Sequence, residues 1–228
     1  MTRRVLICGA GGGLGPVVAR RLADDGAALV AADVRREPLD ALAGELGLPD
    51  ERWRADVVDM LDEAAVRAWA ADVGAVDAVL HLVGGWRGGA GVEETDLADY
   101  AWLHDGLVRT LQHVSRAFLP ALKASGRGRL AIVSSPQAER PSATNAAYGA
   151  TKAASEAWTL AVADELAGHG GTANVVRVNA ILTPRMRAED PDGDFASFTP
   201  AEAIADAFVF LLGDAGTKMN GRRLELRP

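Results

Sequence analysis

The segment from residue 9 to residue 15 constrains the fold of this chain more than any other, because five of its seven residues are glycine. It follows a short apolar run, residues 5–8, and opens a segment, residues 14–25, whose apolar residues recur at helical spacing. Glycine tolerates positive φ and lets other atoms approach the backbone closely. The pattern therefore predicts a strand, a tight glycine turn and a helix whose free N–H groups can receive an anion such as a phosphate.

Strand-like and helix-like segments alternate along the rest of the chain, with no internal repeat or linker. The apolar run 76–83 is typical of a strand buried on both faces. We expect long helices over 96–123 and 146–167, and a strand over 173–180. Pro38 is expected to start a helix, and Thr199 to cap the last helix, with Pro200 at its first position. The alternation predicts one α/β domain over residues 1–228, with a doubly wound parallel sheet and helices on both faces.

The composition narrows the classes of function. Of the 228 residues, 49% are hydrophobic and 24% are charged, which is typical of a globular chain. The net charge is −7, and the sequence shows no basic face of the kind that a nucleic-acid-binding protein needs. No apolar run is long enough to span a membrane. The single cysteine, Cys8, excludes an intramolecular disulfide. We expect a cytoplasmic protein with a small-molecule substrate, no nucleic-acid or membrane partner and no metal.

An acidic residue follows the glycine segment at an informative distance. Asp33 ends the second expected strand, near the ~20-residue offset at which a carboxylate binds the adenosine ribose of a dinucleotide. Such a carboxylate accepts hydrogen bonds from the ribose hydroxyls and repels a 2′-phosphate. We therefore expect a preference for NAD(H). Arg35 and Arg36 follow closely and can soften that preference, so NADP(H) is not excluded.

Tyr148 and Lys152 stand four residues apart at the start of an expected helix and therefore share one face. A free tyrosine has a pKa near ~10 and is a poor acid or base near neutrality. A neighbouring ammonium favours the phenolate, so we expect Lys152 to lower the pKa of Tyr148. The pair is a candidate proton-transfer site.

These residues give the chain a resemblance, over essentially its whole length, to the short-chain dehydrogenase/reductases. Residues 8–15 look like the family's glycine loop with cysteine in place of threonine, and residues 148–152 match its Tyr-x-x-x-Lys motif. Ser135 lies thirteen residues before Tyr148, the family's spacing for the catalytic serine. The resemblance implies a Rossmann-type domain with a seven-stranded parallel sheet. It also implies that Tyr148 exchanges the proton, Lys152 binds the nicotinamide ribose and Ser135 hydrogen-bonds the substrate oxygen.

The resemblance also assigns residues to the cofactor. Asp56 matches the aspartate that contacts the adenine ring. The expected cofactor-binding residues are Gly9, Gly11, Gly12, Gly13, Leu14, Gly15, Asp33, Asp56, Val57, Val83, Gly84, Tyr148, Lys152 and Leu182. Family members usually pair through two long helices, here 96–123 and 146–167, so we expect a homodimer or homotetramer.

Some positions depart from the family pattern. Leu107 stands where the family has a catalytic asparagine, and it cannot help to hold a proton-relay water. His104, one turn earlier on the same face, is a candidate substitute, although an ordinary helix histidine is the simpler interpretation. The family's Asn-Asn-Ala-Gly is replaced by residues 81–84, His-Leu-Val-Gly. Residues 181–198 are short for a substrate lid, which predicts an open site.

A narrower resemblance concerns the substrate. The segment 84–89, Gly-Gly-Trp-Arg-Gly-Gly, and the segment 194–200 are similar to stretches of dihydropteridine reductases, which use NADH on a quinonoid pterin. Trp86 is a candidate for stacking on a planar substrate, and Gln137 and His104 are further substrate candidates. The leading hypothesis is an NAD(H)-dependent oxidoreductase acting on a small carbonyl, alcohol or imine. The alternatives are a dihydropteridine reductase-like enzyme, a cofactor-binding protein without turnover, and a non-redox enzyme on the same fold.

Overall fold

The computed structural model describes residues 2–227 and has one main sheet of seven parallel strands. The strand order across the sheet is β3-β2-β1-β4-β5-β6-β9, so the chain starts in the middle and winds outward in both directions. This confirms the doubly wound parallel sheet that the alternation predicts. The strands are β1 (Arg4–Cys8), β2 (Ala28–Asp33), β3 (Trp53–Val57), β4 (Ala78–His81), β5 (Arg129–Ser134), β6 (Thr172–Arg177) and β9 (Arg223–Glu225).

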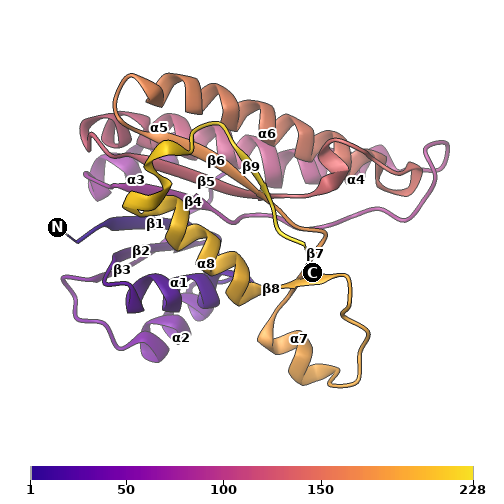
Figure 1. Ribbon diagram of the computed structural model, residues 1–228, viewed down its shortest axis with the longest axis horizontal. Helices are drawn as coiled ribbons and strands as arrows, with labels where there is room; N and C mark the ends of the chain where they lie inside the picture. The colour runs from indigo at the N-terminus through magenta and orange to yellow at the C-terminus, as the bar shows by residue number, and fades with distance from the viewer. Residues whose placement is uncertain (1, 228) are drawn as a thin grey trace.

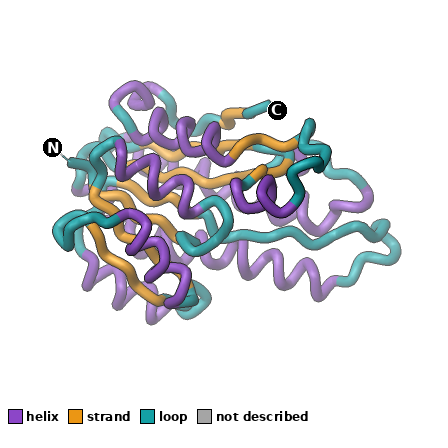
Figure 2. Tube along the Cα trace, turned by 90° about the horizontal axis from the view of Figure 1, so that it is seen from below, coloured by secondary structure: helices purple, strands orange, loops and turns teal. Residues whose placement is uncertain are grey.

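Helices cover both faces of this sheet (Figure 1). One layer holds α1 (Gly15–Asp24), α2 (Arg36–Leu46) and α8 (Ala201–Leu212), and the other holds α3 (Glu63–Val73), α5 (Thr110–Ala124) and α6 (Ala146–Ala167). Figure 2 shows the sheet from below, behind the first layer. Because successive strand side chains point to opposite faces, Ile7 and Leu80 pack under the first layer, whereas Leu6 and Val79 pack under the second.

The helix expected over 96–123 is continuous but not regular. It begins as α4 (Leu97–His104), passes through a π-helical turn at Asp105–Arg109, and continues as α5. Asp96 caps its start by accepting a hydrogen bond from the N–H of Ala98 at 2.8 Å. The π turn falls on Leu107, the position at which the resemblance expects an asparagine, so the departure in sequence coincides with a departure in backbone geometry.

The predicted capping by Thr199 is wrong. Thr199 lies in a short strand, β8 (Phe198–Pro200), which pairs with β7 (Ala180–Leu182), and its hydroxyl donates to the carbonyl of Leu226 at 3.4 Å. The helix α8 begins at Ala201 without a side-chain cap. Tertiary pairing of these segments therefore takes precedence over the local capping signal.

Two other boundaries also differ from the expectation. The helix α2 begins at Arg36, two residues before Pro38, and the strand expected over 173–180 is divided into β6 and β7. Between β7 and β8 the chain forms the short helix α7 (Pro184–Glu189), which projects from the body of the molecule in Figure 1. Thr183 caps α7 by accepting a hydrogen bond from the N–H of Met186 at 3.2 Å.

The topology determines where a site can lie. The connections from β1 and from β4 leave the sheet in opposite directions, and a crevice opens between adjacent strands at such a switch point, outside their carboxyl ends. The glycine segment follows β1, the turn 82–85 follows β4, and Ser135 follows β5. Three predicted parts of the site therefore meet at one edge of the sheet.

Candidate active site

The glycine segment and Asp33 are joined directly. The N–H of Gly11 donates to Oδ2 of Asp33 at 3.0 Å, and the N–H of Arg35 donates to Oδ1 at 3.2 Å. Asp33 is 8% exposed and ends β2, next to β1 in the sheet. The carboxylate is thus held at the edge of the glycine turn, with its charge beside the carboxyl ends of the strands.

Glycine is required at several points of this turn. Gly9 has a φ of +79°, and a Cβ there would lie 3.0 Å from the backbone nitrogen of Val83. A Cβ on Gly15 would lie 2.2 Å from the carbonyl oxygen of Ala10, where the helix α1 packs against the turn. No side chain caps the N-terminus of α1, so its first N–H groups face the turn without a side-chain partner. A side chain larger than glycine at either Gly9 or Gly15 would clash with neighbouring backbone atoms.

A cavity of about 630 Å³ connects the glycine turn to the expected catalytic residues. Its lining includes Gly9, Gly12, Gly13, Leu14, Gly15, Val83, Gly84, Trp86, Ser135, Gln137, Tyr148 and Lys152. These segments come from four separate parts of the chain, and the structure brings them to one space. It also adds residues that the sequence analysis did not single out as site residues: His81, Asn145, Asn179, Thr183 and Phe198.

Tyr148 and Lys152 face this cavity from the first turns of α6. The Lys152 ammonium lies over the Tyr148 ring, 5.6 Å from its centroid, and donates to the carbonyl of Val133 at 2.9 Å. Ser135 is 2% exposed, and its Oγ accepts a hydrogen bond from the N–H of Gln137 at 3.3 Å. The three residues predicted to share a reaction centre therefore line one wall of one cavity.

Burial dominates the acidity of this pair. It raises the pKa of the Tyr148 phenol to about 12, so the expectation that Lys152 lowers this pKa is wrong. Burial lowers the pKa of Lys152 to about 8, against the opposing charge of Glu156. Tyr148 is thus a protonated phenol at neutral pH, which suits a proton donor.

His81 occupies the end of β4 beside Lys152. Burial and, to a lesser extent, the charge of Lys152 lower its pKa to about 3, so the imidazole is neutral. Its Nε2 lies 3.0 Å from Oγ1 of Thr110, and that hydroxyl donates to the carbonyl of Gly106 at 2.7 Å. Because the hydroxyl hydrogen is used, Nε2 is the protonated ring nitrogen and donates to Thr110. The sequence analysis did not identify His81 as a site residue. The signal that could have identified it is its place as the one polar residue at the end of the apolar run that forms β4.

Five predicted cofactor residues do not line the cavity: Gly11, Asp33, Asp56, Val57 and Leu182. The Asp56 carboxylate accepts hydrogen bonds from Arg54 Nε at 2.7 Å and Trp69 Nε1 at 2.9 Å, and Val57 is exposed. A second cavity of about 360 Å³ is lined by Asp33. In place of Asp56 and Val57, it is lined by Asp59, Met60 and Leu61, which follow them in the chain. Leu182 is buried, while its neighbours Ile181 and Thr183 line the first cavity.

The structure does not bring His104 to the site. Its ring stacks on Tyr100, with 6.0 Å between centroids, and its Nδ1 lies 3.9 Å from Oδ1 of Asp105. Leu107 is buried, and its carbonyl accepts a hydrogen bond from Ser155 Oγ at 3.1 Å. His104 therefore behaves as a helix-surface histidine, and the place of the family's asparagine is filled by apolar packing.

Residues 84–86, the first half of the segment 84–89, line the cavity. Trp86 is 59% exposed, and its Nε1 donates to Oδ1 of Asn145 at 2.8 Å. Asn145 in turn donates to Ser142 Oγ at 2.9 Å, and the N–H of Ser142 donates to Oε1 of Gln137 at 2.7 Å. This chain of hydrogen bonds ties the Trp86 loop to the loop that follows Ser135, so Trp86 and Gln137 belong to one connected rim.

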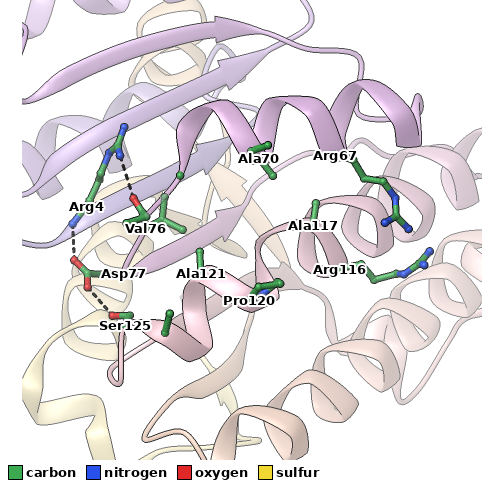
Figure 3. Close-up of a pocket in the computed structure, with 14 residues that line it drawn as sticks. Arg4, Arg67, Ala70, Val76, Asp77, Arg116, Ala117, Pro120, Ala121 and Ser125 are labelled. Carbon is green, nitrogen blue, oxygen red and sulfur yellow. Dashed lines mark hydrogen bonds between the residues drawn. The ribbon is translucent and has the colours of Figure 1, made fainter.

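A larger hollow of about 820 Å³ lies elsewhere, between α3 and α5 (Figure 3). Arg4 and Asp77, which mark the amino ends of β1 and β4, line one end, and Arg67 and Arg116 line the other. Both arginines at that second end are within 3.1 Å of Oε1 of Glu63. None of the predicted site residues reaches this hollow. Among residues 2–227 there is no group of three or more His, Cys, Asp or Glu that could hold a metal ion.

The fold and site define a class, an α/β protein whose glycine turn opens a crevice lined by Ser135, Tyr148 and Lys152. The short chain dehydrogenase family model matches residues 3–192. D-threitol dehydrogenase of Mycolicibacterium smegmatis is 30% identical over 236 residues, covering 96% of this chain and 89% of that protein. An uncharacterized oxidoreductase of Staphylococcus epidermidis is 28% identical over 224 residues, with 98% and 96% covered.

A solved structure agrees with these relatives. The 3-ketoacyl-(acyl-carrier-protein) reductase from Brucella melitensis, complexed with NADH, superposes with a TM-score of 0.85 at 26% identity, covering 98% of this chain and 96% of that one. The chain belongs to the short-chain dehydrogenase family and is an oxidoreductase of that family. None of the helices in the described part of the chain is both long and apolar enough to cross a membrane.

Proposed function

We propose that this protein is an NAD(H)-dependent oxidoreductase that acts on a small, uncharged carbonyl, alcohol or imine substrate. The observation that carries the proposal is the convergence of Ser135, Tyr148 and Lys152 on the cavity that begins at the glycine turn. When bound there, the nicotinamide cofactor supplies or accepts the hydride. The residues of the chain bind and orient the cofactor and the substrate, and they transfer the proton.

The cofactor is assigned to residues that fit its parts. The glycine turn and the uncapped N-terminus of α1 suit the pyrophosphate, because backbone N–H groups and the helix dipole favour an anion. Asp33 suits the adenosine ribose, and its charge disfavours a 2′-phosphate. Lys152, which lines the same cavity near Tyr148, suits the nicotinamide ribose.

The proton steps follow from the buried phenol. Tyr148 donates its proton to the substrate oxygen or nitrogen during reduction, and takes one up during oxidation. Ser135 hydrogen-bonds the same substrate atom. Lys152, as an ammonium ion, favours the phenolate that Tyr148 becomes after it has donated. In this proposal each of the three residues has a separate task.

The substrate class follows from the lining. Among the described residues that line the 630 Å³ cavity, Lys152 is the one ionised side chain, since His81 is neutral. Arg87, beside the mouth, is held by Asp99 at 3.0 Å and lies over the Trp102 ring at 4.1 Å. In this proposal Lys152 binds the nicotinamide ribose, so an ionised group on the substrate would lose hydration without gaining a partner, and the site favours an uncharged compound.

A second candidate is reduction of a planar heterocycle such as a quinonoid pterin. The exposed indole of Trp86, fixed at the rim by Asn145, is the observation that favours it, because a flat ring can stack there. A screen of NADH oxidation tests both candidates, with simple ketones, quinones, cyclic imines and quinonoid dihydropterin as substrates. Turnover of one of the uncharged compounds is expected. Tight NADH binding without turnover of any would contradict the enzyme assignment and favour a cofactor-binding protein.

A further inference from the structure

A buried carboxylate stands one helical turn beyond the proposed catalytic lysine. Glu156 is 2% exposed and lies on α6, four residues after Lys152 and eight after Tyr148. Residues four apart on a helix are neighbours on one face. Glutamate is almost never fully buried unless it is paired, so its partners indicate what its charge does.

Two arginines from the sheet hold this carboxylate. Arg177, at the end of β6, donates from Nε to Oε1 at 2.8 Å and from Nη2 to Oε2 at 2.7 Å. Arg223, on the edge strand β9, donates from Nε to the same Oε2 at 2.6 Å. A two-pronged contact of this kind fixes both the position and the plane of a carboxylate. Glu156 therefore anchors the helix that carries Tyr148 and Lys152 to two strands.

The ion cluster keeps Glu156 charged. Burial raises the pKa of its carboxyl, but the hydrogen bonds from Arg177 and Arg223 outweigh burial and leave the pKa below its usual value. The Arg177 guanidinium also pairs with a second carboxylate, because its Nη1 donates to Glu139 at 2.6 Å. Glu139 follows the short turn after Ser135, so the cluster joins the serine loop to α6 through one guanidinium.

Lys152 has few other charges around it. On β4 it faces His81, which is neutral, and on its own helix it faces the protonated Tyr148. Near the end of β5, the Lys152 ammonium donates a hydrogen bond to the uncharged carbonyl of Val133. Burial lowers the pKa of Lys152 to about 8, and the charge of Glu156 opposes that shift.

We propose that Glu156 is a positioning residue for the Tyr148–Lys152 pair, and that its anchored negative charge keeps Lys152 an ammonium ion. The inference deepens the proposed function and rests on it for its catalytic meaning. Arg223 has the opposite influence in this arrangement, because it neutralises part of the charge that Lys152 experiences.

The chain offers a direct readout, because Lys123, Lys152 and Lys218 are its three lysines. NMR of protein labelled with ¹³C at lysine Cε gives three resonances, whose titration midpoints can be followed with pH in the cofactor-free protein. In Glu156→Gln, the Lys152 midpoint is expected to fall by roughly one pH unit, since an opposite charge is lost. In Arg223→Met, it is expected to rise, since one repelling cation is lost.

The control uses another glutamate of the same helix. Glu165 pairs with Lys123 at 2.5 Å, so Glu165→Gln should leave the midpoint of Lys152 in place. Circular dichroism establishes that each variant is folded. The Arg223 side chain is 40% exposed, so Arg223→Met should fold even if the loss of Glu156 leaves the buried Arg177 without this partner. In that case the titration of Arg223→Met alone decides the outcome.

Opposite shifts in the two variants support the proposal, and an unchanged Lys152 midpoint in folded Arg223→Met or Glu156→Gln overturns it. With an active substrate, the high-pH limb of kcat/KM should move in the same directions as the midpoints. Failure of the proposed function would appear separately, as absence of NADH turnover in the unmodified protein, while the lysine titration stays readable.

Discussion

The N–H of Gly11 donates a 3.0 Å hydrogen bond to Oδ2 of Asp33, across 22 residues of chain. A Cβ on Gly11 would lie 2.6 Å from Pro38 Cβ and 3.0 Å from that carboxylate oxygen. The glycine turn and the predicted ribose carboxylate thus form one unit, which a single methyl group would disturb.

Gly11→Ala is therefore expected to weaken NADH binding by at least about tenfold, or 1.4 kcal/mol. The Asp33 carboxylate must move to admit the methyl group. The substitution therefore disturbs the predicted ribose site, while the hydrophobic core stays intact. Gly44→Ala is the matched control, because no heavy atom outside its own stretch of helix lies within 4 Å of a Cβ there, in the last turn of α2. It should leave NADH binding unchanged and stabilise the fold by about 0.5–1 kcal/mol. Calorimetry and thermal unfolding measure both; equal NADH affinity in the two variants would contradict the assignment.

Cofactor preference should depend on the charge of Asp33. The unmodified protein is expected to bind NADH more tightly than NADPH, because a 2′-phosphate beside this carboxylate is repelled. Asp33→Asn keeps an oxygen for the Gly11 N–H but removes the charge, so the preference should narrow. Titration of both cofactors tests this. Tighter binding of NADPH by the unmodified protein would contradict this. It would indicate that Arg35, whose Nε lies 3.9 Å from Asp33 Oδ1, determines the cofactor preference.

The pH dependence of reduction should follow Lys152. Its pKa of about 8 means that the ammonium is present below this pH and is lost as the pH rises through it. Tyr148, with a pKa of about 12, remains a proton donor throughout that range. The kcat/KM for reduction is therefore expected to be level below pH 8 and to decline above it, since this quantity reports the free enzyme. A profile that stays level to pH ~10, the range of an unperturbed lysine, would show that Lys152 does not carry this role.

The sequence predicted those site features that are local. The glycine turn, Asp33 at a strand end and the Tyr148–Lys152 spacing are all defined by neighbours in the chain, and the structure places them as expected. The parallel sheet followed from alternation alone. These signals need no knowledge of distant contacts.

The features that the sequence did not predict depend on distant contacts. Thr199 has the residue type of a helix cap but pairs as a strand with residues near 181, because β7 lies beside it. Asn145 becomes part of the rim only because Trp86, 59 residues away in the chain, donates to it. The raised pKa of Tyr148 depends on burial, which the Tyr–Lys spacing does not report.

The predicted assembly involves the surface of α6. Ala150, Ala157 and Ala161 are exposed on this helix, and such small side chains allow a second helix to approach closely. We expect a dimer or tetramer through α6 and the α4–α5 helix. Light scattering at micromolar concentration tests this, and Ala157→Arg should shift the protein toward monomer. A monomeric unmodified protein would refute the expectation.

The most direct test of the central claim is the turnover of Tyr148→Phe with the substrate that the NADH screen identifies. The change removes one hydroxyl, so folding and NADH affinity should survive while kcat falls by about two to four orders of magnitude. Lys152→Met should cost more, because it also weakens ribose binding, and Ser135→Ala should cost less than either. Near-normal turnover in Tyr148→Phe, with NADH binding intact, would show that the proton comes from another source and would contradict the proposed mechanism.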